Sequence, residues 1–282
     1  MTIAVTGATG HLGRHVIDTL LTTQAPADIV AIVRNPDKAA PLAELGVQVR
    51  VAPYTDTTAL GEALAGVDRL LLISSSEVGQ RFAQHKNVID AAAAAGVRQI
   101  AYTSVLNATT TPLILAPEHK ATEEYLAASG IATTLLRNGW YTENYAGLVA
   151  EAREHGTVTA AAGEGRVASA TRADYAAAAA AVLQDDSHLG KTYELSGDVA
   201  WSFAEFADTL SELLGRPVRY ASVTPDELAA TLTAAGVPAD GAGFAAALDA
   251  DTAAGYLSET TGDLSRLIGR PTTPLATALA AL

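Results

Sequence analysis

Three glycines near the start of the chain stand at three-residue steps, at Gly7, Gly10 and Gly13. They follow a short apolar run at residues 3–5 and precede an amphipathic segment at residues 11–21. This order predicts a strand, a tight turn and a helix N-terminus, whose unpaired N–H groups bind phosphate oxygens. Gly10 has no side chain to keep a pyrophosphate away, and Gly13 lets the helix pack close to the strand. The segment is therefore predicted to bind a dinucleotide, although a glycine-rich turn without a ligand fits the same spacing.

A basic residue follows the second predicted strand, where such folds contact the adenosine ribose. Arg34 comes directly after the strand at residues 29–33, with Asn35 and Lys38 close behind, and no Asp or Glu stands at the strand end. A carboxylate there would bind a ribose 2′-hydroxyl, whereas a guanidinium pairs with a 2′-phosphate. The pattern favours NADP over NAD, with a solvated surface arginine as the alternative.

Polar residues also follow the third and fourth predicted strands. Asp56 is placed to meet the adenine side of a cofactor, or else it caps a turn. Ser74, Ser75 and Ser76 follow the fourth strand, where small hydroxyl side chains allow close approach of the nicotinamide ribose. The alternative role for these serines is capping of a helix that begins near Val78.

These residues are positioned by a regular alternation of apolar runs and amphipathic segments. Six strands alternating with helices predict an α/β fold with a doubly wound parallel sheet (a Rossmann fold) and right-handed crossovers. The fourth run is continuously apolar, as in a strand buried on both faces. The expected strands are residues 3–5, 29–33, 47–52, 70–73, 100–104 and 133–137, and the expected helices are 11–21, 37–45, 58–64, 80–95 and 117–128.

Beyond Gly139 the alternation loosens, which predicts two domains. We expect an NADP-binding domain at residues 1–139 and a smaller, mostly helical substrate-binding lobe at 140–282, partly interwoven with the first. The alanine run within the second part is predicted to be helical, because alanine is the best helix former. The strands expected there are residues 157–160 and 192–195, and the helices are 172–183, 202–214, 225–234 and 244–254.

The composition narrows the class of protein. A chain of 282 residues can bury a large core, and no apolar run is long enough to cross a bilayer. The absence of cysteine excludes disulfides and thiolate metal sites, and no metal is expected. A net charge of −13 without a basic stripe argues against nucleic-acid binding. No basic segment precedes an apolar one at the start, so a cytoplasmic protein is expected. The sequence is compatible with a homodimer.

Several segments together carry a family resemblance. They resemble the NmrA-like branch of the atypical short-chain dehydrogenases, in particular its bacterial NADPH:quinone reductases. The stretch Arg-Asn-Gly-Trp-Tyr-x-Glu-Asn at 137–144 is far more specific to this family than the glycine motif. The resemblance implies a bilobal, flavin-free enzyme with NADPH across the sheet edge and a quinone in the cleft between the lobes. The matching segments are residues 6–13, 33–36, 72–77, 136–145, 168–174 and 267–273.

The resemblance also implies the residues that contact cofactor and substrate. Trp140 and Tyr141 would line the quinone pocket, although Trp140 is equally suited to packing between lobes. Asn144 would donate a hydrogen bond to a quinone oxygen, and His119 is either a proton donor or a solvated histidine at a helix start. The candidate catalytic residues are His119, Tyr141 and Asn144; the candidate cofactor-binding residues are Gly7, Ala8, Thr9, Gly10, His11, Leu12, Arg34, Ser74, Ser75, Ser76, Asn138, Gly139, Trp140, Tyr141, Thr142, Glu143 and Ser169.

The chain lacks the Tyr-x-x-x-Lys pair of typical short-chain dehydrogenases. None of the nine tyrosines has a lysine four residues on, and the residue four before Lys120 is Ala116. A ketone needs its very basic alkoxide protonated, whereas hydride addition to a quinone gives a phenolate with a pKa near ~10 that water can protonate. The sequence therefore favours quinone reduction over carbonyl reduction. Arg137 is expected in a structural ion pair, and Arg172 and Asp174 in structural roles at a helix start.

Two other functions stay open. An NADP-binding regulatory protein that does not turn its cofactor over would have the same glycine turn and the same arginine. Another reductase of the same branch would act on triphenylmethane dyes or aryl ethers. Reduction of a quinone by NADPH separates the enzyme from the regulator, and a panel of acceptors separates the reductases.

Overall fold

The computed structural model describes residues 1–282, which divide into two compact units. Unit 1 contains residues 1–109, 117–138 and 172–195, and unit 2 contains residues 110–116, 139–171 and 196–282. The chain thus leaves unit 1 after the sixth strand of its sheet and returns to it before the seventh.

Unit 1 is built on a seven-stranded parallel sheet in the order β3-β2-β1-β4-β5-β6-β9. The order reverses between the neighbouring strands β1 and β4, and the glycine turn follows β1. Such a reversal leaves a crevice outside the carboxyl ends of the strands. The doubly wound sheet predicted from the sequence is confirmed. Its strands are β1 Ile3–Thr6, β2 Ile29–Val33, β3 Gln48–Val51, β4 Arg69–Leu72, β5 Gln99–Val105, β6 Ala132–Asn138 and β9 Thr192–Leu195.

The prediction of six strands in this sheet is wrong, because β9 adds a seventh beside β6. The helix that precedes β9, α7 (Arg172–Val182), also belongs to unit 1, where it contacts α1 (His11–Leu20). The sequence placed both segments with the C-terminal part. A periodic pattern reports the local conformation of a segment, and it does not say which sheet the segment joins after a long insertion.

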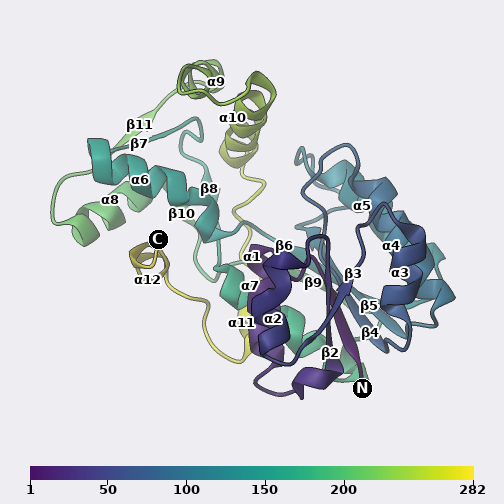
Figure 1. Ribbon diagram of the computed structural model, residues 1–282. Coiled ribbons are helices and arrows are strands. Elements are labelled where there is room, and N and C mark those ends of the chain that lie inside the picture. Colours follow the sequence, from purple (N-terminus) through teal and green to yellow (C-terminus); the bar gives the residue numbers. More distant parts are fainter. The chain divides into compact units, whose positions relative to one another are not determined.

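Helices cover both faces of the sheet. Figure 1 shows α1, α2 and α7 on one side of it and α3, α4 and α5 on the other. The expected helix at 37–45 is instead a 3-10 turn at Asp37–Ala39 followed by α2, Ala40–Glu44. Pro41 lies in the first turn of α2, where its missing N–H costs nothing, so the helix restarts there. The other helices are α3 Thr57–Leu64, α4 Arg81–Ala94 and α5 Ala116–Ala128.

A large apolar cluster of unit 1 lies between the sheet and helices α3 and α4. Leu70 and Leu72 of β4 are fully buried against Val88 and Ile89 of α4 within one cluster, which extends to Tyr102 on β5. Every residue of β4 is buried, as expected for a continuous apolar run in a sheet covered on both faces. The rigid sheet therefore fixes where the loops at its carboxyl edge begin.

Unit 2 combines short strand pairs with helices, and two of its helices begin with capping boxes. Ser202 and Glu205 form the box of α8, and Thr224 and Glu227 form that of α9. In addition, β7 (Thr157–Ala160) pairs with β11 (Arg219–Ser222), and β8 (Arg166–Val167) pairs with β10 (Trp201–Ser202). None of the chain's helices is long and apolar enough to pass through a membrane. The helices of unit 2 are α6 Ala146–His155, α8 Phe203–Leu214, α9 Pro225–Ala234, α10 Ala239–Ala253, α11 Asp263–Ile268 and α12 Leu275–Ala280.

Candidate cofactor-binding site

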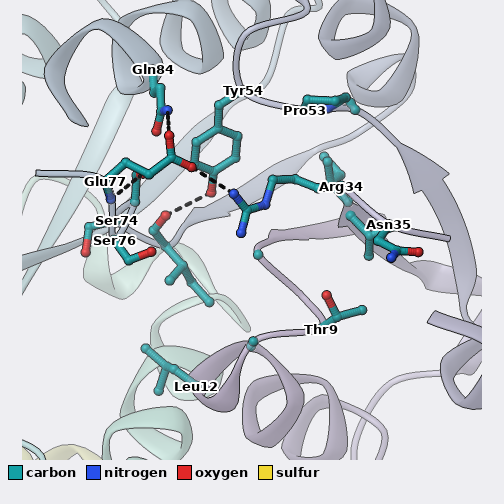
Figure 2. A pocket seen from close by; sticks show the side chains of 18 of the residues that line it. Thr9, Leu12, Arg34, Asn35, Pro53, Tyr54, Ser74, Ser76, Glu77 and Gln84 are labelled. Carbon is teal, nitrogen blue, oxygen red and sulfur yellow. Dashed lines mark hydrogen bonds and ion pairs between the residues drawn. The ribbon is translucent and has the colours of Figure 1, made fainter. Parts of the chain in front are cut away.

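A cavity of about 770 Å³ opens in unit 1 at the carboxyl ends of β1, β2, β3 and β4. Its walls come from the glycine turn, from the segments that follow β2, β3 and β4, and from one residue each of α4 and α7. Figure 2 shows the side chains that point into it. The cavity lies at the point where the strand order reverses, which is where open α/β sheets bind ligands. Its size suits an extended small-molecule ligand.

The glycine turn has the geometry predicted from its spacing. Gly7 adopts a φ of +59°, and Gly10 N–H donates to the Gly7 carbonyl at 2.8 Å. A Cβ atom on Gly13 would lie 2.3 Å from that carbonyl oxygen, so only glycine permits α1 to approach so closely. Gly10 is the N-cap of α1 and provides no side-chain cap, and the first turn holds no acidic residue. The first N–H groups of α1 are therefore available to an anion.

Positive charge dominates the cavity walls. Arg34, Lys38 and Arg172 line it, and Glu77 is the one acidic residue among the lining residues. This concentration of cations stands out in a chain with a net charge of −13. Such a lining favours a ligand that carries several phosphate charges.

Arg172, for which the sequence predicted a structural role, also lines the cavity. It is the first residue of α7, and the packing of α7 against α1 brings it to the cavity. No local signal predicts this, because most strands of the sheet lie between the glycine turn and Arg172 in the sequence. Only the return of the chain from unit 2 to unit 1 places it there.

Tyr54 is a second lining residue that the sequence did not indicate. Its hydroxyl donates to the Ile73 carbonyl at 2.9 Å, which joins the segment after β3 to the segment after β4. Burial raises the pKa of this hydroxyl well above its usual value, so it acts as a neutral donor. Nearby Asp56 does not line the cavity; it caps α3 by accepting from Ala59 N–H at 3.0 Å, which confirms the capping alternative.

The three serines after β4 line the cavity, and they do not cap a helix. Helix α4 begins at Arg81, with Gln80 as its N-cap, so the capping alternative is wrong. Ser74 N–H donates to Thr103 Oγ1 at 2.9 Å, and Ser75 N–H donates to His85 Nε2 at 2.9 Å. Both bonds tie the segment to the core, because their acceptors are buried.

Behind these serines lies a buried polar cluster of His85, Tyr102, His119 and Thr122. Because His85 Nε2 accepts from Ser75, the proton of this ring must sit on Nδ1, which lies 2.9 Å from Thr122 Oγ1. The Tyr102 hydroxyl lies 2.8 Å from His119 Nδ1. Burial lowers the pKa of His85 to about 3 and that of His119 well below its usual value. His119 is buried, so the solvated alternative for it is wrong.

The buried histidines predict a loss of stability in mild acid. The unfolded chain protonates His85 near the ordinary pKa of ~6.5, while the folded protein keeps it neutral down to about pH 3. The free energy of unfolding therefore falls as the pH drops below ~6.5, by about 2 kcal/mol at pH 5 from His85 alone. Urea unfolding at pH 7 and pH 5 measures the change in the free energy of unfolding between the two pH values. This change should be smaller in His85→Gln than in the unaltered protein. His15→Gln, at an exposed position, is the control. An equal change in the free energy of unfolding in all three proteins would contradict the prediction.

Arg137 forms the structural ion pair expected from the sequence. Its guanidinium lies between Glu123, with Nη2 to Oε2 at 2.6 Å, and Glu194, with Nη1 to Oε1 at 2.7 Å. Hydrogen bonds to these carboxylates raise the pKa of Arg137 above its ordinary value. Ser104 also donates to Glu123, at 2.6 Å. The network joins β5, α5, β6 and β9, and it holds the edge of the sheet together.

The remaining candidate residues are divided between the units. Asn138 is buried at the end of β6 in unit 1, and Ala8 is fully buried beneath the glycine turn, whereas its neighbours Thr9, His11 and Leu12 line the cavity. The roles of Asn138, of the stretch at 139–144 and of Ser169 toward a ligand stay predictions.

Within unit 2, two of these candidates meet. Thr142 Oγ1 lies 2.8 Å from Ser169 Oγ, which also accepts from Trp201 Nε1 at 2.9 Å. Tyr141 forms a bridge with Ala170, and Thr142 N–H donates to the Ala170 carbonyl at 2.9 Å. Two of the family-like segments, 136–145 and 168–174, are therefore held side by side.

The reversed strand order, the glycine turn and the cationic cavity together define the dinucleotide-binding class of doubly wound α/β proteins. The NmrA-like family model matches residues 1–249, and the chain belongs to this family. The family and the fold class predicted from the sequence are therefore confirmed.

Close relatives share this fold over their full length. The chain is 54% identical over 274 residues to quinone oxidoreductase 2 of Escherichia coli strain K12, covering 97% of this chain and 96% of that protein. The crystal structure of the E. coli NADPH-dependent quinone oxidoreductase complexed with NADPH matches with a TM-score of 0.96 and 53% identity over 99% of both chains. The NADP(H) complex of Citrobacter sp. triphenylmethane reductase matches with a TM-score of 0.95 and 41% identity, also over 99% of both chains.

Proposed function

We propose that this protein is an NADPH-dependent quinone reductase that transfers hydride without a flavin. The observation that carries the proposal is the cavity at the strand-order reversal, with the bare N-terminus of α1 on one side and three cations around it. The high identity to an E. coli quinone oxidoreductase supports the choice of acceptor. The overall reaction takes NADPH, a quinone and one proton to NADP⁺ and a hydroquinone.

In this proposal the chain contributes mainly binding and positioning. The N–H groups of the first turn of α1 hold the pyrophosphate, and Arg34 pairs with the 2′-phosphate. Ser74 and its two serine neighbours leave room for the nicotinamide ribose. The nicotinamide supplies the hydride when it is bound, and exclusion of water keeps the transfer direct. Tyr141, Trp140 and Asn144 are proposed to contact the quinone.

The proton balance requires little from the protein. Hydride addition to a quinone leaves a phenolate, whose pKa of ~10 lets water protonate it. His119, held neutral by burial, bonds to Tyr102 and is proposed to have a structural role here, although the sequence made it a candidate catalytic residue. In this assignment water, and not His119, protonates the phenolate.

Replacement of His119 tests this assignment. We expect His119→Phe to lower turnover by less than about tenfold and to lower the free energy of unfolding by about 1–3 kcal/mol, because the buried Tyr102 hydroxyl loses its partner. Steady-state kinetics and urea unfolding measure the two effects. His119→Gln, which keeps a hydrogen-bonding group, should restore part of the stability. A loss of turnover by several orders of magnitude in a folded variant would make His119 the proton donor.

A panel of electron acceptors at one NADPH concentration tests the substrate class. We expect menadione and benzoquinone to be reduced faster than triphenylmethane dyes or aryl ethers. A marked preference for a dye would favour the second reductase function, which the similarity to the Citrobacter enzyme supports. Tight NADPH binding with no acceptor reduced would favour a regulatory protein.

A cytoplasmic location and a homodimer remain part of the proposal, and sedimentation of the purified protein tests the latter.

A further inference from the structure

The acidic residue in the cationic cavity has no evident place in a site for a phosphorylated ligand. Glu77 is the one carboxylate among the lining residues, and it lies beside the arginine proposed to bind the 2′-phosphate. Glu77 Oε1 accepts from Arg34 Nη1 at 2.8 Å, and Oε2 accepts from Gln84 Nε2 at 2.8 Å. Figure 2 shows the three side chains in a row, with Glu77 between the other two. Both oxygens of the carboxylate therefore accept hydrogen bonds from side chains of the cavity wall.

The backbone around Glu77 is held by hydrogen bonds, whereas its side chain is half-exposed. Glu77 N–H donates to Ser75 Oγ at 3.2 Å, and two residues further on Gly79 N–H donates to Glu118 Oε2 at 3.0 Å. The side chain of Glu77 is 48% exposed and that of Arg34 is 70% exposed. An ion pair this exposed contributes only about 0–1 kcal/mol. A rotation of the Glu77 side chain can therefore release Arg34 at little cost.

We infer that Glu77 is a specificity-determining residue for the cofactor: its carboxylate holds the Arg34 guanidinium until a 2′-phosphate displaces it. The inference rests on the proposed function. A 2′-phosphate carries more charge than a carboxylate and offers the guanidinium more acceptors, so it wins the exchange. A ribose 2′-hydroxyl is uncharged and cannot displace the Glu77 carboxylate from Arg34. NADH must therefore bind beside an arginine that is already paired. Glu77 thus weakens the binding of a phosphorylated ribose while it leaves that of an unphosphorylated ribose nearly unchanged, and it thereby moderates the preference for NADPH over NADH.

Removal of the Glu77 charge tests this role at the adenosine end of the cofactor. Glu77→Gln keeps the shape of the side chain and an oxygen for Arg34, but it abolishes the competing charge. We expect this variant to bind NADPH and 2′,5′-ADP about three- to tenfold more tightly, because an exposed pair and a like-charge repulsion are removed. Binding of NADH and of 5′-AMP should change by less than about twofold. Titration calorimetry of the purified protein measures all four constants.

Two further variants make the result specific. Glu62→Gln removes a carboxylate from an exposed position on α3 that does not line the cavity, and it should leave all four constants unchanged. In an Arg34→Ala background the gain from Glu77→Gln should shrink to less than half, because there is no guanidinium left to release. A gain of the same size in that background would mean that Glu77 acts by repulsion alone and would overturn the exchange.

The outcomes also separate this inference from the proposed function. Weaker or unchanged binding of 2′,5′-ADP to Glu77→Gln would overturn the inference, since Glu77 would then orient Arg34 or have no role. If the unaltered protein still reduced menadione with NADPH, the proposed function would stand. Failure of the unaltered protein to bind NADPH and 2′,5′-ADP would remove both.

Discussion

Arg34→Glu is expected to lower the preference for NADPH over NADH by about a hundredfold or more, measured as the ratio of the two kcat/KM values with menadione. The guanidinium that pairs with the 2′-phosphate is lost, and the new carboxylate repels that phosphate. Arg34 also lies 2.8 Å from Glu77, so the variant places two carboxylates together at the cavity wall. Most of the change should therefore come from weaker use of NADPH, while the kcat/KM for NADH changes little.

A matched charge reversal away from the cavity provides the control. Lys191→Glu makes the same change in net charge at an exposed position outside the cavity lining, and its kcat/KM ratio should equal that of the unaltered protein. If Arg34→Glu leaves the ratio unchanged as well, Arg34 does not contact the 2′-phosphate. The basis for choosing NADPH would then have to lie with Lys38 or Arg172.

Gly13→Ala is expected to cause a large loss of both stability and cofactor binding. The new Cβ would lie 2.3 Å from the Gly7 carbonyl oxygen and 2.8 Å from the Ala8 Cα atom, and both are backbone atoms that cannot rotate away. Helix α1 must therefore move off the sheet, and this movement also disturbs its contact with α7. We expect the free energy of unfolding to fall by about 3 kcal/mol or more.

The same displacement opens the turn that is proposed to hold the pyrophosphate. NADPH binding to Gly13→Ala should therefore weaken beyond detection by calorimetry, even at temperatures where the variant is folded. Gly61→Ala is the control, because Gly61 lies within α3 and its added methyl group would meet nothing within 4 Å. That variant should gain about 0.5–1 kcal/mol from helix propensity. Equal effects of the two substitutions in urea unfolding would contradict the close packing of α1 on the turn.

The parts of the site that lie within one βα unit could be predicted from the sequence. The turn from Gly7 to Gly13 is a local structure, because its residues are neighbours in the chain and their spacing follows from the geometry of the turn. The position of Arg34 could be predicted for the same reason, since it depends only on where β2 ends. The parallel sheet was predictable because buried strands and amphipathic helices alternate regularly through the first half of the chain.

Features that depend on contacts between distant segments were missed. The Arg34–Glu77 pair exists because β2 and β4 flank β1, so their carboxyl ends meet only in the folded sheet. Arg172 reaches the cavity because the chain returns from unit 2 to unit 1. No periodic pattern in the sequence predicts that return. The burial of His119 likewise depends on the packing of α5 against β5, not on its place in a first helical turn.

A single-turnover experiment on purified protein without flavin tests the central claim most directly. The protein is first saturated with NADPH, and its reduced-nicotinamide absorbance is followed by stopped flow after menadione is added in the absence of oxygen. We predict a loss of absorbance that goes to completion, at a rate that rises with menadione concentration, with one hydroquinone formed for each NADPH oxidised. Bound NADPH that keeps its absorbance, or that is oxidised only after flavin is added, would contradict direct hydride transfer from this cofactor to a quinone.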